Sequence, residues 1–397
     1  MNTLILLPSH QVEREAPDAG SARLRHMAQL DGLRGLAVIM VLLQHAIPPF
    51  GKIFPVAHSG VILFFVLSGF LITSILLADR RDADSDGGRW MPRLGLFYMR
   101  RALRLMPIYI LVVVLGLIFN VGVARSCWAW LLSYTTNFAL VSRGAWIDAY
   151  FHFWTLAIEE QFYLLWPLVV LAAPRCVLGP LVVAMIAVGV LYRGLAVARH
   201  FSVIATYCPT PACLDSLGMG ALIALAGSSD NSNGLSIARF FRGPAFWFGL
   251  TGVVLARVAV RFGFDWIDVV FLDLAQAVGF AGLVVLAAGG MPGWAGWLLD
   301  RNWLRSIGIV SYGIYVYHVF LPPFLMRLLA LATGNPMALP DTGLKLLMLL
   351  SIFVVPVLSW YGIERPINRL RSRFRLPAPL FSAMSNVAVK PVGVATK

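Results

Sequence analysis

The sequence predicts an all-α integral membrane protein with about ten transmembrane helices packed in one bundle. Its 397 residues are 59% hydrophobic and only 13% charged, whereas ordinary soluble chains carry about 25% charged residues. Apolar runs of 17 to 23 residues recur from residue 33 to residue 362. Each run is long enough to cross a hydrocarbon core of about 30 Å as an α-helix. We therefore expect one polytopic membrane domain without a separate soluble module.

The distribution of lysine and arginine predicts how these helices are oriented, because basic residues collect in the cytoplasmic loops of membrane proteins. With Arg34 set aside as intramembrane, 22 basic residues lie on the side that holds both termini, and nine, Arg193 among them, lie on the other. Both termini are therefore expected in the cytoplasm, beneath the inner membrane of the cell, which requires an even number of spans. The predicted spans cover residues 33–49, 59–77, 105–123, 153–173, 178–196, 212–227, 242–260, 268–289, 306–328 and 344–362.

Three segments are expected along the chain. Residues 1–30 form a cytoplasmic N-terminal arm, and residues 31–363 form the transmembrane domain. Residues 364–397 begin with a basic stretch and then lose all apolar periodicity, which is typical of a disordered cytoplasmic tail. Within the domain, residues 126–141 are apolar but short and rich in hydroxyl groups, so this segment is expected to lie at the interface or to re-enter rather than to span.

The net charge of +13 is explained by this topology, so no nucleic-acid partner is expected. The four cysteines show no zinc-like spacing with histidine, so no metal site is expected either. Cys208 and Cys213 share one predicted loop. A disulfide between them and simple packing are both compatible with the sequence.

The first apolar helix carries two ionisable residues, Arg34 and His45. Ionisable groups inside a bilayer are costly, so such a pair indicates a functional site. Eleven positions separate them, which is a rise of roughly 16 Å, and the two side chains lie within about 20° of one helix face. With Arg34 at one membrane surface, His45 lies more than halfway across, and we interpret it as the reactive centre of a membrane enzyme.

A basic cluster precedes the third span and consists of Arg100, Arg101 and Arg104. Arg100 and Arg104 are four residues apart on a helix and therefore share a face. The cluster either fixes membrane orientation alone or binds phosphate, which guanidinium groups hold through paired hydrogen bonds. Phosphates on the cytoplasmic side would indicate a nucleotide-bearing cosubstrate. The sequence has no glycine-rich phosphate loop, which argues against the common nucleotide-binding modes.

Two adjacent carboxylates, Glu159 and Glu160, open another apolar helix. They point about 100° apart, so at most one is expected to share a site with His45. A buried glutamate beside a histidine orients the imidazole and allows it to act as a general base toward a hydroxyl group. An interhelical ion pair with an arginine is the alternative for such a glutamate.

Candidate substrate-binding residues lie in two segments. Gln161 and Tyr163 follow the two glutamates, although ordinary interhelical hydrogen bonds would account for them equally well. Tyr315 and His318 belong to the segment SYGIYVYH, which puts several hydroxyl groups and an imidazole in one span. An aromatic belt at the membrane interface is the alternative interpretation of this second segment.

Taken together, these stretches resemble the membrane-bound acyltransferase-3 family of polysaccharide and antibiotic O-acyltransferases. They occur in the same order as in the family and extend over nearly the whole chain. All of them together identify the family far more specifically than any single segment would. The matching segments are LDGLRGLAVIMVLLQHA (30–46), FFVLSGFLIT (64–73), RRALRLMPIY (100–109), FWTLAIEEQFYLLWP (153–167), SYGIYVYH (311–318) and ERPINR (364–369).

The resemblance implies a ten-helix core that uses cytoplasmic acetyl-CoA, or a related acyl-CoA, to acylate hydroxyl groups. Arg34 and His45 match the family signature of an arginine and a histidine separated by ten residues, and His45 would be the catalytic imidazole. Glu159 matches the carboxylate that follows a Trp-Ser/Thr-Leu turn, with Thr155 where serine is commoner.

The basic cluster matches the motif thought to hold the phosphates of CoA, and we assign Arg34 to the same donor site. The residues of this predicted donor site are Arg34, Arg100, Arg101 and Arg104. Many members of the family carry an SGNH hydrolase-like domain after the core, and we do not expect such a domain in this sequence.

We therefore expect an enzyme, a membrane O-acyltransferase, in which His45 oriented by Glu159 deprotonates the acceptor. No cofactor is expected to be bound permanently; acyl-CoA is the cosubstrate, and a glycan or a glycosylated small molecule is the acceptor. A transporter or flippase of lipid-linked sugars is the alternative from another class, because intramembrane charges and ten helices fit it too. The acceptor, the acyl chain length, direct or covalent transfer and the oligomeric state stay open.

Overall fold

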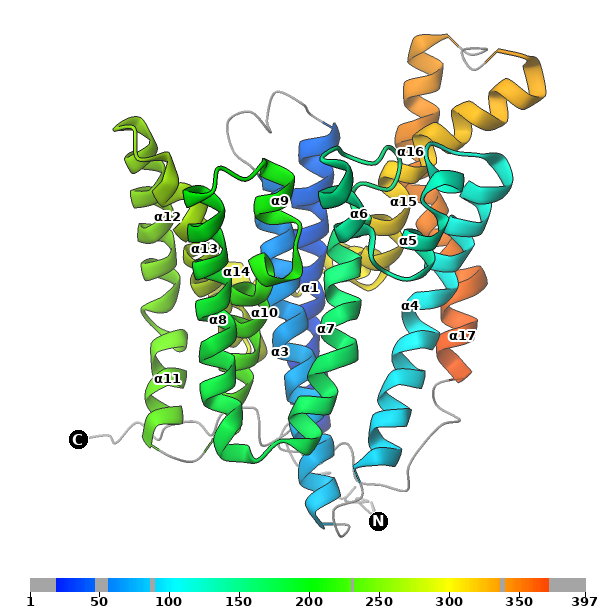
Figure 1. Cartoon of the computed structure of the whole chain (residues 1–397). Helices are drawn as coiled ribbons and strands as arrows, with labels where there is room; N and C mark the ends of the chain where they lie inside the picture. The colour runs from blue at the N-terminus through cyan, green and yellow to red at the C-terminus, as the bar shows by residue number, and fades with distance from the viewer. Residues whose placement is uncertain (1–18, 47–55, 86–89, 230–231, 336–339, 371–397) are drawn as a thin grey trace, which may run out of the picture.

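The computed structural model describes residues 19–46, 56–85, 90–229, 232–335 and 340–370. Within these ranges every regular element is a helix, which confirms the predicted all-α fold. Most of the long helices stand side by side and roughly parallel, and shorter helices lie between their ends (Figure 1). The N-terminal arm before residue 19 and the tail after residue 370 lie outside the described residues.

Within the described residues, each predicted span falls on a helix. These helices are α1 (Ala19–Ala46), α3 (Val56–Ser85), α4 (Met91–Phe119), α7 (Phe153–Ala172), α8 (Arg175–Ala198), α10 (Leu214–Gly227), α12 (Ala245–Arg261), α13 (Asp265–Ala288), α15 (Asn302–Thr333) and α16 (Asp341–Ser359). Among the described residues, eight helices are long and apolar enough to cross a membrane, or nine if α11 and α12, bent by 65°, form one span. Helix α1 is not among them, so the total of ten stays a prediction.

The remaining elements are short. They are η1 (Ala124–Ser126), α5 (Trp128–Leu132), α6 (Thr136–Arg143), α9 (Val203–Tyr207), η2 (Thr210–Cys213), α11 (Ser232–Arg242), α14 (Gly293–Leu299), the π-helical turn η3 (Trp360–Glu364) and α17 (Arg365–Leu370). The segment 126–141 forms η1, α5 and α6, none of which is long enough to cross a hydrocarbon core. Cys208 and Cys213 lie near η2 as free, buried cysteines.

Large apolar side chains remain exposed along the outer helices. Examples are Leu191 on α8, Trp247 on α12 and Leu358 on α16. A water-soluble protein rarely exposes so many, whereas the lipid-facing surface of a membrane protein requires them. The exposed apolar surface and the membrane-length helices together identify a multi-pass membrane protein.

Small residues allow α1 to pack closely against α15. A Cβ atom added to Gly35 would collide with the main-chain carbonyl of Leu304, and one added to Gly308 would collide with the carbonyl of Asp31. Glycine at such positions lets the backbones of two membrane helices approach one another. Because α1 also packs against α3, the polar residues of α1 are held against both neighbours.

A buried ion-pair network joins four helices elsewhere in the bundle. The guanidinium group of Arg193 on α8 is fully buried and donates to the Asp215 carboxylate of α10 at 2.5 Å. It also lies 3.6 Å from the carboxylate of Asp273 on α13, which in turn is 2.7 Å from Nε2 of His58 on α3. Arg193 was expected among the basic residues of a membrane face, but the structure places it inside the bundle.

Candidate active site

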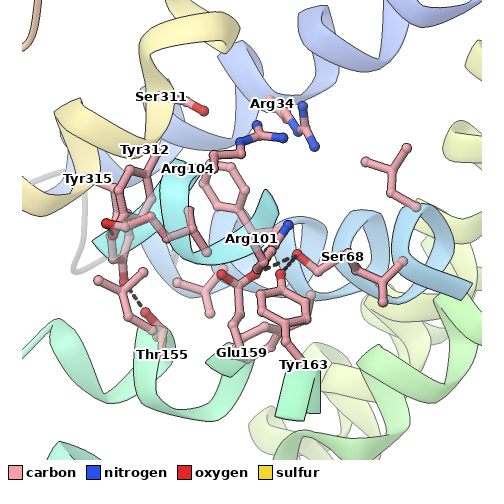
Figure 2. A pocket seen from close by; sticks show the side chains of 17 residues that line it. Arg34, Ser68, Arg101, Arg104, Thr155, Glu159, Tyr163, Ser311, Tyr312 and Tyr315 are labelled. Carbon is pink, nitrogen blue, oxygen red and sulfur yellow. Dashed lines mark hydrogen bonds between the residues drawn. The ribbon is translucent and has the colours of Figure 1, made fainter. Parts of the chain in front are cut away.

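A cavity lies between α1, α3, α4, α7 and α15, and it has an empty volume of about 690 Å³ including its open side. Apolar side chains such as Val61, Phe65 and Leu156 form part of its wall. The labelled polar side chains gather around the same space in Figure 2. They are Arg34, Ser68, Arg101, Arg104, Thr155, Glu159, Tyr163, Ser311, Tyr312 and Tyr315.

Three guanidinium groups give this cavity a positive side. Arg34, Arg101 and Arg104 come from α1 and α4, and Figure 2 shows them pointing into the same space. Arg34 lies 3.3 Å from the carboxylate of Asp31 on its own helix. Arg101 stacks over Tyr163, with its guanidinium carbon 3.5 Å from the ring centroid. Converging guanidinium groups favour an anion such as phosphate.

Arg100 differs from the other residues of the predicted donor site. It is half-buried on α4 but does not line the cavity. Its charge acts instead on Asp79 of α3. The structure therefore brings three of the four predicted arginines together and turns Arg100 away from them.

The carboxylate of Glu159 belongs to the wall of the cavity. It accepts a hydrogen bond from the Ser68 hydroxyl at 2.5 Å, and that hydroxyl accepts one from Tyr163 at 2.8 Å. Figure 2 shows these three polar groups next to one another in the lining of the cavity. The structure does not bring Glu159 to His45, because the contacts of that imidazole lie elsewhere.

His45 lies at the far end of α1 and is exposed. Its Nδ1 is 2.8 Å from the main-chain oxygen of Val41. Its ring contacts Phe151, with a centroid separation of 5.8 Å, and His318, with a separation of 5.2 Å. The predicted candidates His45 and His318 are therefore neighbours, although neither lines the cavity.

A third imidazole, His152, completes this group. Its ring centroid is 4.8 Å from that of His318, and only 3% of its surface is exposed. Burial and the neighbouring His318 keep the pKa of His152 well below its usual range. Nδ1 of His152 and Nε2 of His318 are buried without a hydrogen-bond partner among the described residues.

Tyr315 links the cavity to the histidines. Its hydroxyl lies 2.6 Å from that of Thr155, and both residues line the cavity. Its ring also contacts His152 and His318, with centroid separations of 5.5 Å and 5.4 Å. Figure 2 shows the Thr155–Tyr315 pair on the side of the cavity away from Arg34. The contacts of Tyr315 therefore connect the wall of the cavity to His318 and, through the ring of His318, to His45.

Gln161 takes no part in either group. Its amide nitrogen donates to the carbonyl of Tyr134 at 3.0 Å and to the side chain of Asn137 at 3.1 Å, and its oxygen accepts from Thr210. The side chain thus joins α7 to α6 and η2. In the described part of the chain, no group of three or more His, Cys, Asp or Glu side chains is arranged to hold a metal ion.

Two residues of these groups were not singled out from the sequence. Ser68 lies in the family-like segment FFVLSGFLIT but had no role assigned. His152 directly precedes the segment that begins at Phe153, and an imidazole at the start of an apolar span was the available signal.

Most of this chain is similar to known proteins. A family model described as an acyltransferase domain matches residues 27–364. Peptidoglycan O-acetyltransferase OatA of Listeria monocytogenes is 26% identical over 374 residues, covering 87% of this chain and 56% of the relative. O-acetyltransferase OatA of Staphylococcus aureus is 28% identical over 323 residues, covering 74% of this chain and 50% of the relative. The chain thus spans about half the length of these curated relatives. No solved structure matches it.

Proposed function

The chain belongs to the acyltransferase-3 family, whose model matches residues 27–364, and on that premise we propose that it is an integral membrane O-acyltransferase. The donor is acyl-CoA bound from the cytoplasm, with acetyl as the first candidate for the acyl group. The acceptor is a hydroxyl group of a glycan, for which the names of the two relatives, both O-acetyltransferases and one acting on peptidoglycan, give support. The enzyme acts in the inner membrane of the cell.

The observation that carries this proposal is the connection between the arginine-lined cavity and the histidines. Tyr315 lines the cavity and also contacts the ring of His318, which contacts His45. Phosphate groups held by Arg34, Arg101 and Arg104 would leave the flexible arm of CoA free to extend along α1. Arg34 and His45 are separated by a rise of roughly 16 Å, a distance comparable with that arm.

His45 is suited to act as the general base. A main-chain carbonyl can only accept a hydrogen bond, so Nδ1 of His45 carries a proton for Val41, and Nε2 carries the lone pair. Nε2 removes the proton of the acceptor hydroxyl as its oxygen attacks the acyl carbonyl carbon. The carbon–sulfur bond then breaks, and the CoA thiolate takes the proton. General-base catalysis of this kind contributes about 10²–10⁴-fold to a rate.

Transfer of radiolabelled acetyl tests the proposal. The purified full-length chain in detergent receives labelled acetyl-CoA together with candidate glycans. We expect label on a glycan and free CoA thiol in equal amount; label on the protein with acetyl-CoA alone would indicate a covalent intermediate. A transporter or flippase would leave all label on CoA, which would overturn the proposal.

We expect Arg104→Ala to raise the KM for acyl-CoA by roughly 10- to 100-fold with little change in kcat, because a hydrogen bond to a charged group contributes about 1.5–3 kcal/mol to binding. Arg100→Ala is the matched control from the same helix, and its side chain lies outside the cavity. Its KM should rise by less than about 3-fold. Steady-state kinetics with varied acetyl-CoA measures both. Equal effects of the two substitutions would count against the assignment of the cavity to the donor.

We expect Glu159→Gln to leave kcat within about 5-fold of wild type, because the amide oxygen still accepts from Ser68 and the side chain does not contact His45. Glu159→Leu removes the carboxylate that accepts the hydrogen bond of Ser68, so Ser68 and Tyr163 are no longer held in place. We expect this variant to bind acyl-CoA about 10-fold more weakly. Steady-state kinetics with varied acetyl-CoA separate the effect on kcat from the effect on acyl-CoA binding. A fall in kcat beyond about 1000-fold in the glutamine variant would mean that Glu159 acts on the reacting groups, as the sequence predicted.

A further inference from the structure

A short loop beside His45 carries an exposed tryptophan. The loop covers residues 144–152 and joins α6 to α7. The ring centroid of Phe151 lies 5.8 Å from that of His45, and the ring centroid of Trp146 lies 5.9 Å from that of Phe151. Trp146 is 51% exposed, and His45 is exposed as well. An aromatic surface therefore continues from the imidazole of His45 to the outside of the bundle.

Buried side chains on the same loop hold its backbone in place. The side chain of Ile147, next to Trp146, is buried. Tyr150 is fully buried, and its ring packs against those of Phe153 and Phe320 at centroid separations of 5.6 Å and 5.9 Å. Trp146 is therefore presented on an anchored backbone. A ligand that binds its ring has little of the loop left to order, which lowers the entropic cost of binding.

The position of this loop distinguishes Trp146 from the lipid-facing side chains of the outer helices. The backbone between α6 and α7 is irregular, and irregular backbone exposed to lipid does not occur in the hydrocarbon core because its polar groups would lack partners. Arg143 and Asp148, on either side of Trp146 in the sequence, are both exposed. Charged side chains that face hydrocarbon are costly. The exposed face of Trp146 therefore meets water or the headgroup region.

A flat aromatic side chain with charged neighbours is suited to a sugar. A sugar ring presents C–H groups on its faces and hydroxyl groups at its edge. Its faces pack on an aromatic ring, and polar side chains hydrogen-bond its hydroxyl groups. Trp146 supplies the aromatic ring, while Arg143 offers donors and Asp148 offers acceptors close by in the sequence. An aromatic belt at the membrane interface also uses tryptophan, but it requires no contact with the residues around His45.

Resting on the proposed function, we propose that Trp146 and Phe151 form the binding site for the glycan acceptor. A sugar ring stacks on Trp146, and Phe151 lies between that ring and His45, so a hydroxyl group of the glycan reaches the imidazole. The donor occupies the arginine-lined cavity, which ends at Tyr315 on the side of the histidines. Donor and acceptor therefore approach His45 by different routes.

The KM for the glycan tests this site. Peptidoglycan fragments are the probe, since the name of one relative gives that acceptor, and the purified full-length chain transfers labelled acetyl to them at saturating acetyl-CoA. We expect Trp146→Leu to raise the KM for the fragments roughly 10-fold, because leucine is apolar but has no flat face. Trp146→Phe keeps an aromatic face and should raise this KM by less than about 3-fold.

Trp128→Leu is the matched control. Trp128 is the first residue of α5, in the same connection between α4 and α7, and it is 55% exposed. In the described part of the chain its ring makes no contact with Phe151 or His45. The KM of this variant for the fragments should match that of wild type. A role limited to anchoring in the membrane interface would make Trp128→Leu and Trp146→Leu behave alike.

The KM for acetyl-CoA, measured at saturating glycan, completes the test. It should be the same in wild type and both Trp146 variants, because Trp146 does not line the arginine-lined cavity. A rise in the KM for acetyl-CoA, or an unchanged KM for the fragments in Trp146→Leu, would overturn the acceptor site while acyl transfer by wild type still supports the proposed function. No transfer by wild type to these fragments or to any other glycan would overturn the proposed function, and this proposal with it.

Discussion

Replacing His45 with alanine is expected to reduce acyl transfer by at least about 1000-fold, because the variant lacks the group that removes the acceptor proton. The affinity for acyl-CoA should change little, since His45 does not line the arginine cavity. The loss should therefore appear in kcat rather than in KM. His45→Gln should be nearly as inactive, because an amide accepts a hydrogen bond but is not a base.

Transfer of labelled acetyl, measured together with equilibrium binding of acetyl-CoA, separates these two effects. His200→Asn is a suitable control, since His200 is exposed at the end of α8 with a φ of 53°, which asparagine adopts readily. The control should match wild type in both measurements. Full activity in the alanine variant would remove the physical basis of the enzyme assignment.

The helical bundle could be predicted from the sequence because the signals are local. Runs of 17 or more apolar residues specify membrane-length helices whatever their neighbours are. The short helices α5 and α6 were also foreseen as a non-spanning segment, since residues 126–141 are too few to cross. Which helices touch one another is not a local property. The close approach of α1 to α15 depends on glycines such as Gly35 and Gly308, far apart in sequence.

The residues that line the cavity could likewise be predicted only in part from the sequence. Helical spacing predicted that Arg100 and Arg104 share a face, yet only Arg104 lines the cavity with Arg101. Spacing along one helix gives relative directions, but the packing of α4 against its neighbours decides which direction is inward. The motif resemblance indicated four arginines for the donor site, and three of them line the cavity.

The position of Glu159 along the axis of α7 explains why its side chain does not reach His45. His152, just before α7, lies next to the ring of His318 that contacts His45. Glu159 is seven residues further along, a rise of roughly 10 Å, and shares the cavity with Arg34. Helices α1 and α7 therefore run in opposite directions, because the start of α7 lies near the end of α1. Helical spacing predicts the direction in which the glutamate points around α7, but not its level in the membrane relative to His45 on α1.

Arg193 is the residue whose environment was furthest from the sequence-based expectation, and its replacement should destabilise the fold most. Arg193→Met removes the only cation within hydrogen-bond distance of Asp215 among the described residues and one of the cations beside Asp273. Breaking one partner of a buried ion pair costs about 3–5 kcal/mol, because the remaining charge is buried without compensation. A lower unfolding temperature and lower denaturant resistance in detergent would report this loss.

Two further variants separate charge from packing. Combining Arg193→Met with Asp215→Asn removes one positive and one negative charge, so part of the lost stability should return, and the double-mutant cycle should give a coupling of about 1–3 kcal/mol. Arg257→Met is the exposed counterpart: its pair with Asp268 spans 3.2 Å, but 40% of the arginine side chain is accessible. Screening by solvent limits that pair to less than about 1 kcal/mol. If Arg193→Met were as mild as Arg257→Met, the buried charges would have to be neutralised by protonation rather than by the guanidinium group.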